Sequence, residues 1–213
     1  MTPRTTIKIN RSSLPSHEIE RIARIYRQCF PGSIRSLLGQ SACVRFFTAV
    51  LNSEDSISLT ARHGNTIVGF ALLIESNQRL NLSQFLLKTV PDIFRLNIRT
   101  NTKLLKKIIK KFLKKMAVKS QNSPKICCIE KDSKNEAMIY LDILAVEKSF
   151  RRLGIGKALV ENCLQIARQN GFVKLELTVK MDNEKAIKLY ESVGFGCLIK
   201  DTETRYCTLC INA

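Results

Sequence analysis

The stretch that decides the fold is LAVEKSFRRLGIGKAL, residues 144–159. An apolar run ends at Val146, and apolar residues spaced three to four apart begin again at Ile155. This pattern predicts a buried strand, a short loop and a helix, with Gly154 and Gly156 where the loop meets the helix. Glycines at such a junction let the backbone approach a ligand closely, and the free N–H groups of a helix N-terminus bind anions.

The loop is also basic, which makes a phosphate or pyrophosphate its expected ligand. Arg151, Arg152 and Lys157 add positive charge beside the amides. The alternative is a tight strand-to-helix turn whose arginines are simply solvated. The loop is not a P-loop, because G-x-x-x-x-G-K-[ST] is absent, and it is not the Rossmann fingerprint, which needs a third glycine and a ribose-binding acid.

Periodic patterns on both sides of this unit predict further helices and strands. Before it, we expect a strand at 5–10, helices at 16–30 and 34–51, and strands at 56–62, 66–74 and 137–147. After the loop, we expect a helix at 154–169, a strand at 173–180, a short helix at 183–192, and strands at 197–200 and 205–211. The near-continuous apolar run at 137–147 is typical of a central strand covered on both faces. The order of these elements predicts an α/β (α+β) domain with a mixed sheet flanked by helices.

Residues 77–136 interrupt this order, and we interpret them as a basic helical insertion between two strands of a single domain, 1–213. The chain has 35 basic and 18 acidic residues, a net charge of +17. Residues 93–119 hold two Arg, eight Lys and no acidic residue, so ten of the surplus charges lie there. In Thr102–Val118, apolar residues occupy one half of a helix and lysines the other. We favour a helix packed on the domain with solvated lysines over contact with an anionic membrane or attraction of anionic ligands.

The composition narrows the class of protein. Hydrophobic residues make up 45% of the chain and charged residues 25%, as in a soluble globular protein. No apolar run approaches the length of about 18 residues that spans a membrane, and residues 1–8 lack an apolar signal core, so we expect a cytoplasmic protein. The eight cysteines share no spacing of a disulfide framework or a zinc site. Cys207 and Cys210 would point to opposite faces of a strand, so we expect reduced thiols and no metal.

Two motifs, in this order, resemble the signatures of one family. Residues 151–156 match the Q/R-x-x-G-x-G/A signature of the GNAT superfamily of N-acetyltransferases. The stretch NEKAIKLYESVGF, residues 183–195, resembles its second signature, N-x-x-A-x-x-x-Y-x-x-x-G-F. A predicted helix and strand separate the two. The resemblance covers residues 137–210 and extends weakly to the helices and hairpin of 16–75.

The resemblance implies a GNAT-like mixed, mostly antiparallel sheet and a site for acetyl-CoA without a metal. In the superfamily the pantetheine arm lies along a splayed central strand, which maps to Leu144, Ala145 and Val146. The pyrophosphate lies on the loop amides, which maps to Arg151, Arg152, Leu153, Gly154, Ile155, Gly156 and Lys157. Asn183 matches a residue that contacts the cofactor arm, and Tyr190 matches the tyrosine that protonates the departing thiolate. Asn183 could also cap the helix, and Tyr190 could be a core aromatic.

The implied reaction is transfer of an acetyl group from acetyl-CoA to a primary amine by direct attack. The backbone N–H of Val146 could polarise the carbonyl. Asp142 is the candidate base, because it lies two residues before Leu144 and therefore on the same strand face, which Tyr140 shares. A carboxylate in an apolar strand suits this role, although Asp142 could instead pair with a basic neighbour. The alternatives are Glu75 and Glu176.

Two other functions compete with catalysis. One is a non-catalytic GNAT-fold module that binds CoA or a partner, and the other is a membrane- or RNA-surface protein that uses the lysine-rich helix. The intact loop together with Asn183 and Tyr190 favours catalysis. We expect a small-molecule amine as acceptor and no nucleic acid. A homodimer and peripheral contact of Thr102–Val118 with an anionic membrane stay open.

Overall fold

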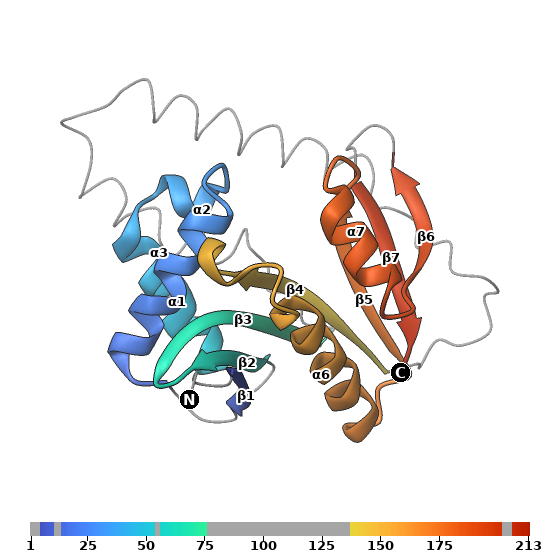
Figure 1. Ribbon diagram of the computed structural model, residues 1–213, viewed down its shortest axis with the longest axis horizontal. Helices are drawn as coiled ribbons and strands as arrows, with labels where there is room; N and C mark the ends of the chain where they lie inside the picture. The colour runs from blue at the N-terminus through green and yellow to red at the C-terminus, as the bar shows by residue number, and fades with distance from the viewer. Residues whose placement is uncertain (1–4, 11–13, 54–55, 76–136, 202–205) are drawn as a thin grey trace.

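One sheet runs through the whole molecule. The computed structural model describes residues 5–10, 14–53, 56–75, 137–201 and 206–213 (Figure 1). The seven strands are β1 (Thr5–Asn10), β2 (Ser56–His63), β3 (Thr66–Glu75), β4 (Met138–Val146), β5 (Lys174–Lys180), β6 (Gly196–Asp201) and β7 (Tyr206–Asn212). Their order in the sheet is β1-β2-β3-β4-β5-β7-β6. Neighbours are antiparallel except β4 and β5, which are parallel, so the predicted mixed sheet is confirmed.

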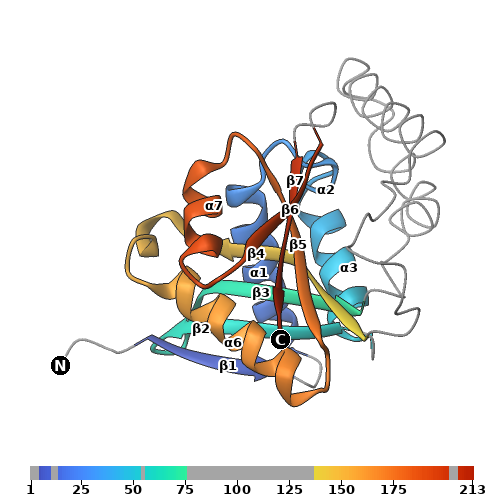
Figure 2. The same cartoon turned by 90° about the vertical axis from the view of Figure 1, so that its right-hand side faces the viewer.

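Helices cover both faces of this sheet (Figure 2). One face carries α1 (Ser16–Cys29), α2 (Ile34–Leu37) and α3 (Gln40–Leu51), and the other carries α6 (Ile155–Gln169) and α7 (Glu184–Glu191). We call these the α1–α3 face and the α6–α7 face. Alternate residues of β3 divide between the two: Phe70 and Leu72 pack into the α1–α3 core, and Ala71 and Leu73 into the α6–α7 core. Burial on both faces explains the continuous apolar runs of the central strands.

One predicted helix is wrong in its extent. The spacing of apolar residues predicted a single helix over 34–51, but the structure has α2 and α3 with Gly39 between them. Gly39 has φ +97°, a left-handed conformation that glycine adopts readily and that a right-handed helix excludes. The other elements predicted within the described residues are confirmed to within two residues at their ends.

The basic insertion, 77–136, and with it the helix predicted at Thr102–Val118, lies outside the described residues. In the part of the chain that the structure describes, no helix is long and apolar enough to cross a membrane.

Strand β4 carries a bulge at Asp142. Two consecutive residues of β3 pair with Ile143 and Leu141, so Asp142 is an extra residue in β4. An extra residue reverses the alternation of faces beyond it. Leu144 therefore packs on the α6–α7 core, whereas Asp142 faces Arg35 of α2. The prediction that Asp142 and Leu144 share a face is wrong for this reason.

Strands β4 and β5 pair over only part of their length. Their last pair joins Leu141 to Leu177, whereas β4 stays paired with β3 as far as Val146. Beyond that pair the two strands diverge, and we call the opening between them the splay (Figure 1). Because parallel strands end at the same edge of a sheet, the loops after β4 and β5 both lie at the open end of the splay.

Candidate active site

The last residue of β4 faces the splay with its backbone. The N–H of Glu147 donates to the carbonyl of Val68 at 2.8 Å, so Glu147 points toward β3. By alternation, the N–H and carbonyl of Val146 point toward the splay. The carbonyl accepts hydrogen bonds from Nε of Arg151 at 2.9 Å and from Sγ of Cys29 at 3.4 Å. The N–H of Val146 is therefore the group that this residue offers to a ligand.

The loop after β4 presents free amides to the same region. Arg152 has φ +67° and Gly154 has φ +75°, and Arg152 is the described non-glycine residue with a left-handed backbone. Such a conformation costs about 1–3 kcal/mol and is concentrated at functional sites. The first α6 hydrogen bond from this loop runs from the N–H of Ala158 to the carbonyl of Gly154. The backbone N–H groups of the three residues before Ala158 have no acceptor within the helix. These residues are Ile155, Gly156 and Lys157.

Arg151 is turned back onto the protein rather than toward an anion. Besides its bond to Val146, its Nη2 donates to Sγ of Cys29 at 3.3 Å. Arg151 thus ties the loop to the end of β4 and to the end of α1. The expectation that Arg151 only adds charge for a pyrophosphate omitted this role. Cys29 had no signal in the sequence, because its partners are more than a hundred positions away.

Most of the other predicted ligands in the loop are exposed, whereas Ile155 is buried. Arg152, Leu153 and Lys157 lie at the surface, and Lys157 makes a half-exposed pair with Glu161 at 3.8 Å, which contributes little stability. Asn183 occupies the N-cap position of α7, but its side chain makes no capping hydrogen bond. Asn183 is therefore the N-cap residue of α7, as the cap interpretation expects, but it caps through its backbone carbonyl, which accepts from the N–H groups of Ala186 and Ile187. The exposed amide of Asn183 can reach a ligand at the end of β5.

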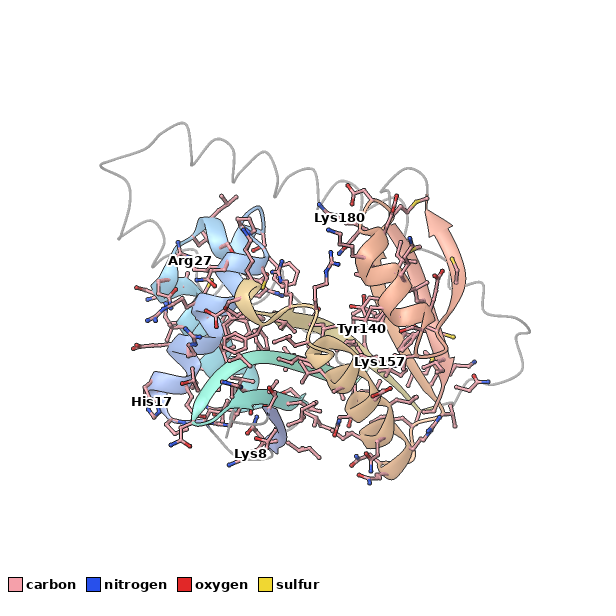
Figure 3. All side chains as sticks on the ribbon, viewed as in Figure 1. Lys8, His17, Arg27, Tyr140, Lys157 and Lys180 are labelled. Atoms are coloured by element: carbon pink, nitrogen blue, oxygen red, sulfur yellow. The ribbon has the colours of Figure 1, made fainter. Side chains whose placement is uncertain are left out.

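Tyr190 belongs to the core as well as to the site. Its side chain is 7% exposed and packs against Phe195 with the ring centroids 5.7 Å apart. Burial, with smaller contributions from Cys163 and Tyr140, raises the pKa of Tyr190 well above its usual value. The phenol is therefore protonated at neutral pH. Tyr190 lies in the α6–α7 core, whereas Tyr140 lies on β4 at the base of the splay (Figure 3).

Asp142 does not lie in the apolar surroundings that its strand suggests. Its side chain is 29% exposed, and its carboxylate lies 3.9 Å from Nη1 of Arg35. Arg35 in turn stacks on the ring of Phe46, with its guanidinium carbon 3.9 Å from the centroid. Asp142 and Tyr140 do share the α1–α3 face, as the alternation predicted. Glu75 is exposed at the end of β3.

Two further features shape the end of β4, and the sequence motifs include neither. A Cβ on Gly69 would lie 3.0 Å from the carbonyl oxygen of Ala145, so the close approach of β3 to β4 depends on this glycine. Arg21 of α1 forms an ion pair with Glu147 and also donates to the carbonyl of Ile67 at 3.0 Å. These contacts hold α1 against β4 at the mouth of the splay.

This arrangement agrees with one family. A family model described as "Acetyltransferase (GNAT) family" matches residues 123–195, which contain both motifs and both of the diverging strands. Over residues 123–195 the chain is a member of the GNAT superfamily. This match confirms the resemblance to GNAT proteins that the two sequence motifs indicated, and the observed sheet confirms the predicted GNAT-like fold.

Known relatives of this GNAT protein are N-acetyltransferases by name. It is 33% identical over 82 residues to N-alpha-acetyltransferase 50 of Danio rerio, covering 38% of this chain and 48% of that protein. It is 40% identical over 53 residues to the ribosomal protein bS18-alanine N-acetyltransferase of Escherichia coli K12, covering 25% of this chain and 36% of that protein. The GNAT chain thus matches less than half the length of these curated relatives.

A solved structure shares the fold over nearly the whole chain. Arabidopsis thaliana NAA60 in complex with acetyl-CoA has a TM-score of 0.56 to this GNAT protein, with 18% identity. The similarity covers 98% of this chain and 99% of that chain. At this identity the likeness establishes the fold.

Proposed function

We propose that this protein is an acetyl-CoA-dependent N-acetyltransferase that acts by direct attack of a primary amine. The observation that carries the proposal is the splay, where β4 has an unpaired backbone edge ending beside the free amides of α6. An extended amide-bearing chain can pair with such an edge, and a diphosphate can bind at the amides. The names of the relatives and the acetyl-CoA complex of a similar structure support the same activity.

The edge of β4 and the loop that follows it would hold neighbouring parts of the co-substrate. The backbone of Leu144, Ala145 and Val146 would pair with the pantetheine arm, and the amides of 155–157 would bind the pyrophosphate with Arg152 and Lys157 nearby. Acetyl-CoA supplies an acyl group activated as a thioester. Arg151 holds the loop against the end of β4 for this binding, because its side chain donates hydrogen bonds to Val146 and Cys29.

Three groups would then serve the transfer. At the far end of the pantetheine arm, the N–H of Leu144, which by alternation faces the splay as that of Val146 does, donates to the thioester oxygen and stabilises the charge that develops there. Asp142, directly or through a water, takes the proton of the attacking amine as the C–N bond forms and the C–S bond breaks. Tyr190, protonated because burial raises its pKa, donates to the departing sulfur.

For the acceptor, we propose the α-amine of a polypeptide. The sequence had favoured a small amine, because no peptide-binding pattern is visible in it. Two relatives carry an N-alpha or a ribosomal-protein acceptor in their names, and this supports the polypeptide class. A simple assay distinguishes a polypeptide acceptor from a small-molecule amine.

The test is an acceptor panel with purified protein and acetyl-CoA, read by thiol release and by the mass of the product. The panel holds tetra-alanine amide, an N-acetylated peptide whose only amine is a lysine side chain, spermidine and glucosamine. We expect acetylation of tetra-alanine amide and none of the N-acetylated peptide. Acetylation of spermidine or glucosamine alone would refute the acceptor class but keep the activity. Binding of acetyl-CoA without turnover of any amine would refute the activity and favour a CoA-binding module.

A further inference from the structure

Glu176 of β5 is a buried carboxylate that the proposed transfer does not use. The residue is 4% exposed, and its Oε1 is fully buried with no hydrogen-bond partner among the residues that the structure describes. Its neighbours Leu175 and Leu177 pack into the α6–α7 core, so by alternation Glu176 lies on the α1–α3 face. A buried carboxylate oxygen without a donor is unfavourable, because it has lost its water without a replacement. A cation or a donor that arrives from outside the chain would remove that penalty.

The sheet register places Glu176 at the base of the splay. Its partner on β4 is Tyr140, and the next pair, Leu141 with Leu177, is the last before the strands diverge. Figure 3 labels Tyr140 at this point. A strand rises about 3.3 Å per residue, so the Glu176 side chain is within reach of a group bound in the first part of the splay.

Of the carboxylates near this position, Glu176 is the one suited to bind a cation from outside the chain. Asp142, on the same face of β4, already has Arg35 at 3.9 Å. Lys174 precedes Glu176 on the same face of β5, and Cys210 is its register partner on β7. Oε1 of Glu176 has no partner from any of these.

We propose that Glu176 binds the ammonium group of the acceptor at the base of the splay, directly or through one water. The acceptor then approaches from the α1–α3 face as a cation, before it loses the proton that permits attack. An α-amine has a pKa of about 7.7–8.0, so most of it carries this charge at neutral pH. The inference rests on the proposed N-acetyltransferase function and names the charge state in which the acceptor binds.

The test compares Glu176→Gln with the parent and with Glu191→Gln, which removes an exposed carboxylate of α7. The probe is tetra-alanine amide, whose only cation is its α-ammonium, and its N-acetylated form is the neutral control. Glu176→Gln should raise the KM for tetra-alanine amide at least about tenfold, the scale of a lost charge-assisted contact, and leave the thermal shift by acetyl-CoA unchanged. Glu191→Gln should match the parent in both.

The thermal stability of Glu176→Gln distinguishes a binding role of Glu176 from a structural one. Because Gln replaces a buried carboxylate whose Oε1 has no hydrogen-bond partner among the described residues, Glu176→Gln without ligand should melt at the parent's temperature or above it. A melting temperature several degrees lower would overturn the inference, since the carboxylate would then stabilise the fold.

Direct binding separates this inference from the proposed activity. Tetra-alanine amide is titrated by calorimetry into the CoA-loaded parent and the CoA-loaded Glu176→Gln variant. Weaker binding by the variant supports the inference even if the parent acetylates no amine, which would refute the proposed activity alone. Equal affinity, including no binding to either, overturns the inference whatever the parent's turnover.

Discussion

Gly154 offers the sharpest test of the cofactor site, through the pair Gly154→Asp and Gly154→Asn. A Cβ added at this position meets no atom within 4 Å, so neither side chain clashes with the protein. Both place a non-glycine residue at φ +75°, at a cost of about 1–2 kcal/mol that Asp and Asn reduce by local hydrogen bonding. In a domain of this size such a cost lowers the melting temperature by about 2–8 °C. The two variants therefore differ from each other by charge alone.

The charge acts on the anion that the neighbouring amides would bind. A carboxylate about 5 Å from a phosphate opposes its binding by about 1–3 kcal/mol, allowing for solvent at this exposed residue. The Kd for acetyl-CoA should therefore rise about 10- to 100-fold in Gly154→Asp relative to Gly154→Asn. With ligand at a hundred times the parent's Kd, the parent gains about 2.7 kcal/mol of stability, and Gly154→Asp should keep only about 0.4–1.4 kcal/mol of this gain.

The assay is thermal unfolding at several acetyl-CoA concentrations, with each protein compared with its own ligand-free form. Gly154→Asn should keep most of the parent's shift. Equal shifts in the Asp and Asn variants would refute the reasoning, because the loop amides could not then hold the pyrophosphate.

Three further variants test the rest of the structure. Tyr190→Phe should lower kcat by about 10²-fold with little change in acetyl-CoA affinity, because it removes a positioned acid, as steady-state kinetics would show. Gly69→Ala forces a Cβ to 3.0 Å from the carbonyl of Ala145, so it should lower stability by about 1–3 kcal/mol in denaturant unfolding and weaken acetyl-CoA binding. The hydrogen bond from Arg62 lowers the pKa of Glu18 below 4.5, so this pair stabilises the fold above that pH and the contribution is lost on acidification below it. Glu18→Gln should therefore be less stable than the parent at pH 7, by about 2 kcal/mol, and the difference should shrink toward pH 3.

Each of these predictions has a matched control. An unchanged kcat in Tyr190→Phe at every pH would leave Tyr190 as a core residue only. Gly196→Ala is the control for Gly69→Ala, since its Cβ would lie 4.0 Å from the nearest backbone oxygen and should be tolerated. Glu20→Gln, an exposed change on the same helix as Glu18, should show no pH-dependent difference from the parent. A Glu18 effect that does not vary with pH would contradict the assignment to its charge.

Local pattern was enough for most elements and for the position of the basic loop, 151–156. The apolar run at 137–147 predicted β4, and the glycines at 154 and 156 predicted the strand-to-helix junction, because both signals depend on residues that are neighbours in the chain. The same local signals misread the extent of one helix. The pattern over 34–51 is apolar enough for one helix, but the left-handed backbone of Gly39 divides it into α2 and α3.

The candidate site combines local motifs with contacts that no motif contains. The amino-acid pattern alone predicts the fold class, the basic loop and the position of Asn183 and Tyr190 after the second diverging strand, since spacing along a strand or helix carries that information. Only the tertiary structure decided the bulge that separates Asp142 from Leu144, the bonds of Arg151 to Cys29 and Val146, and the burial of Glu176. Register, burial and ion pairing join segments far apart in the chain, and the energies that select them arise only when those segments pack together.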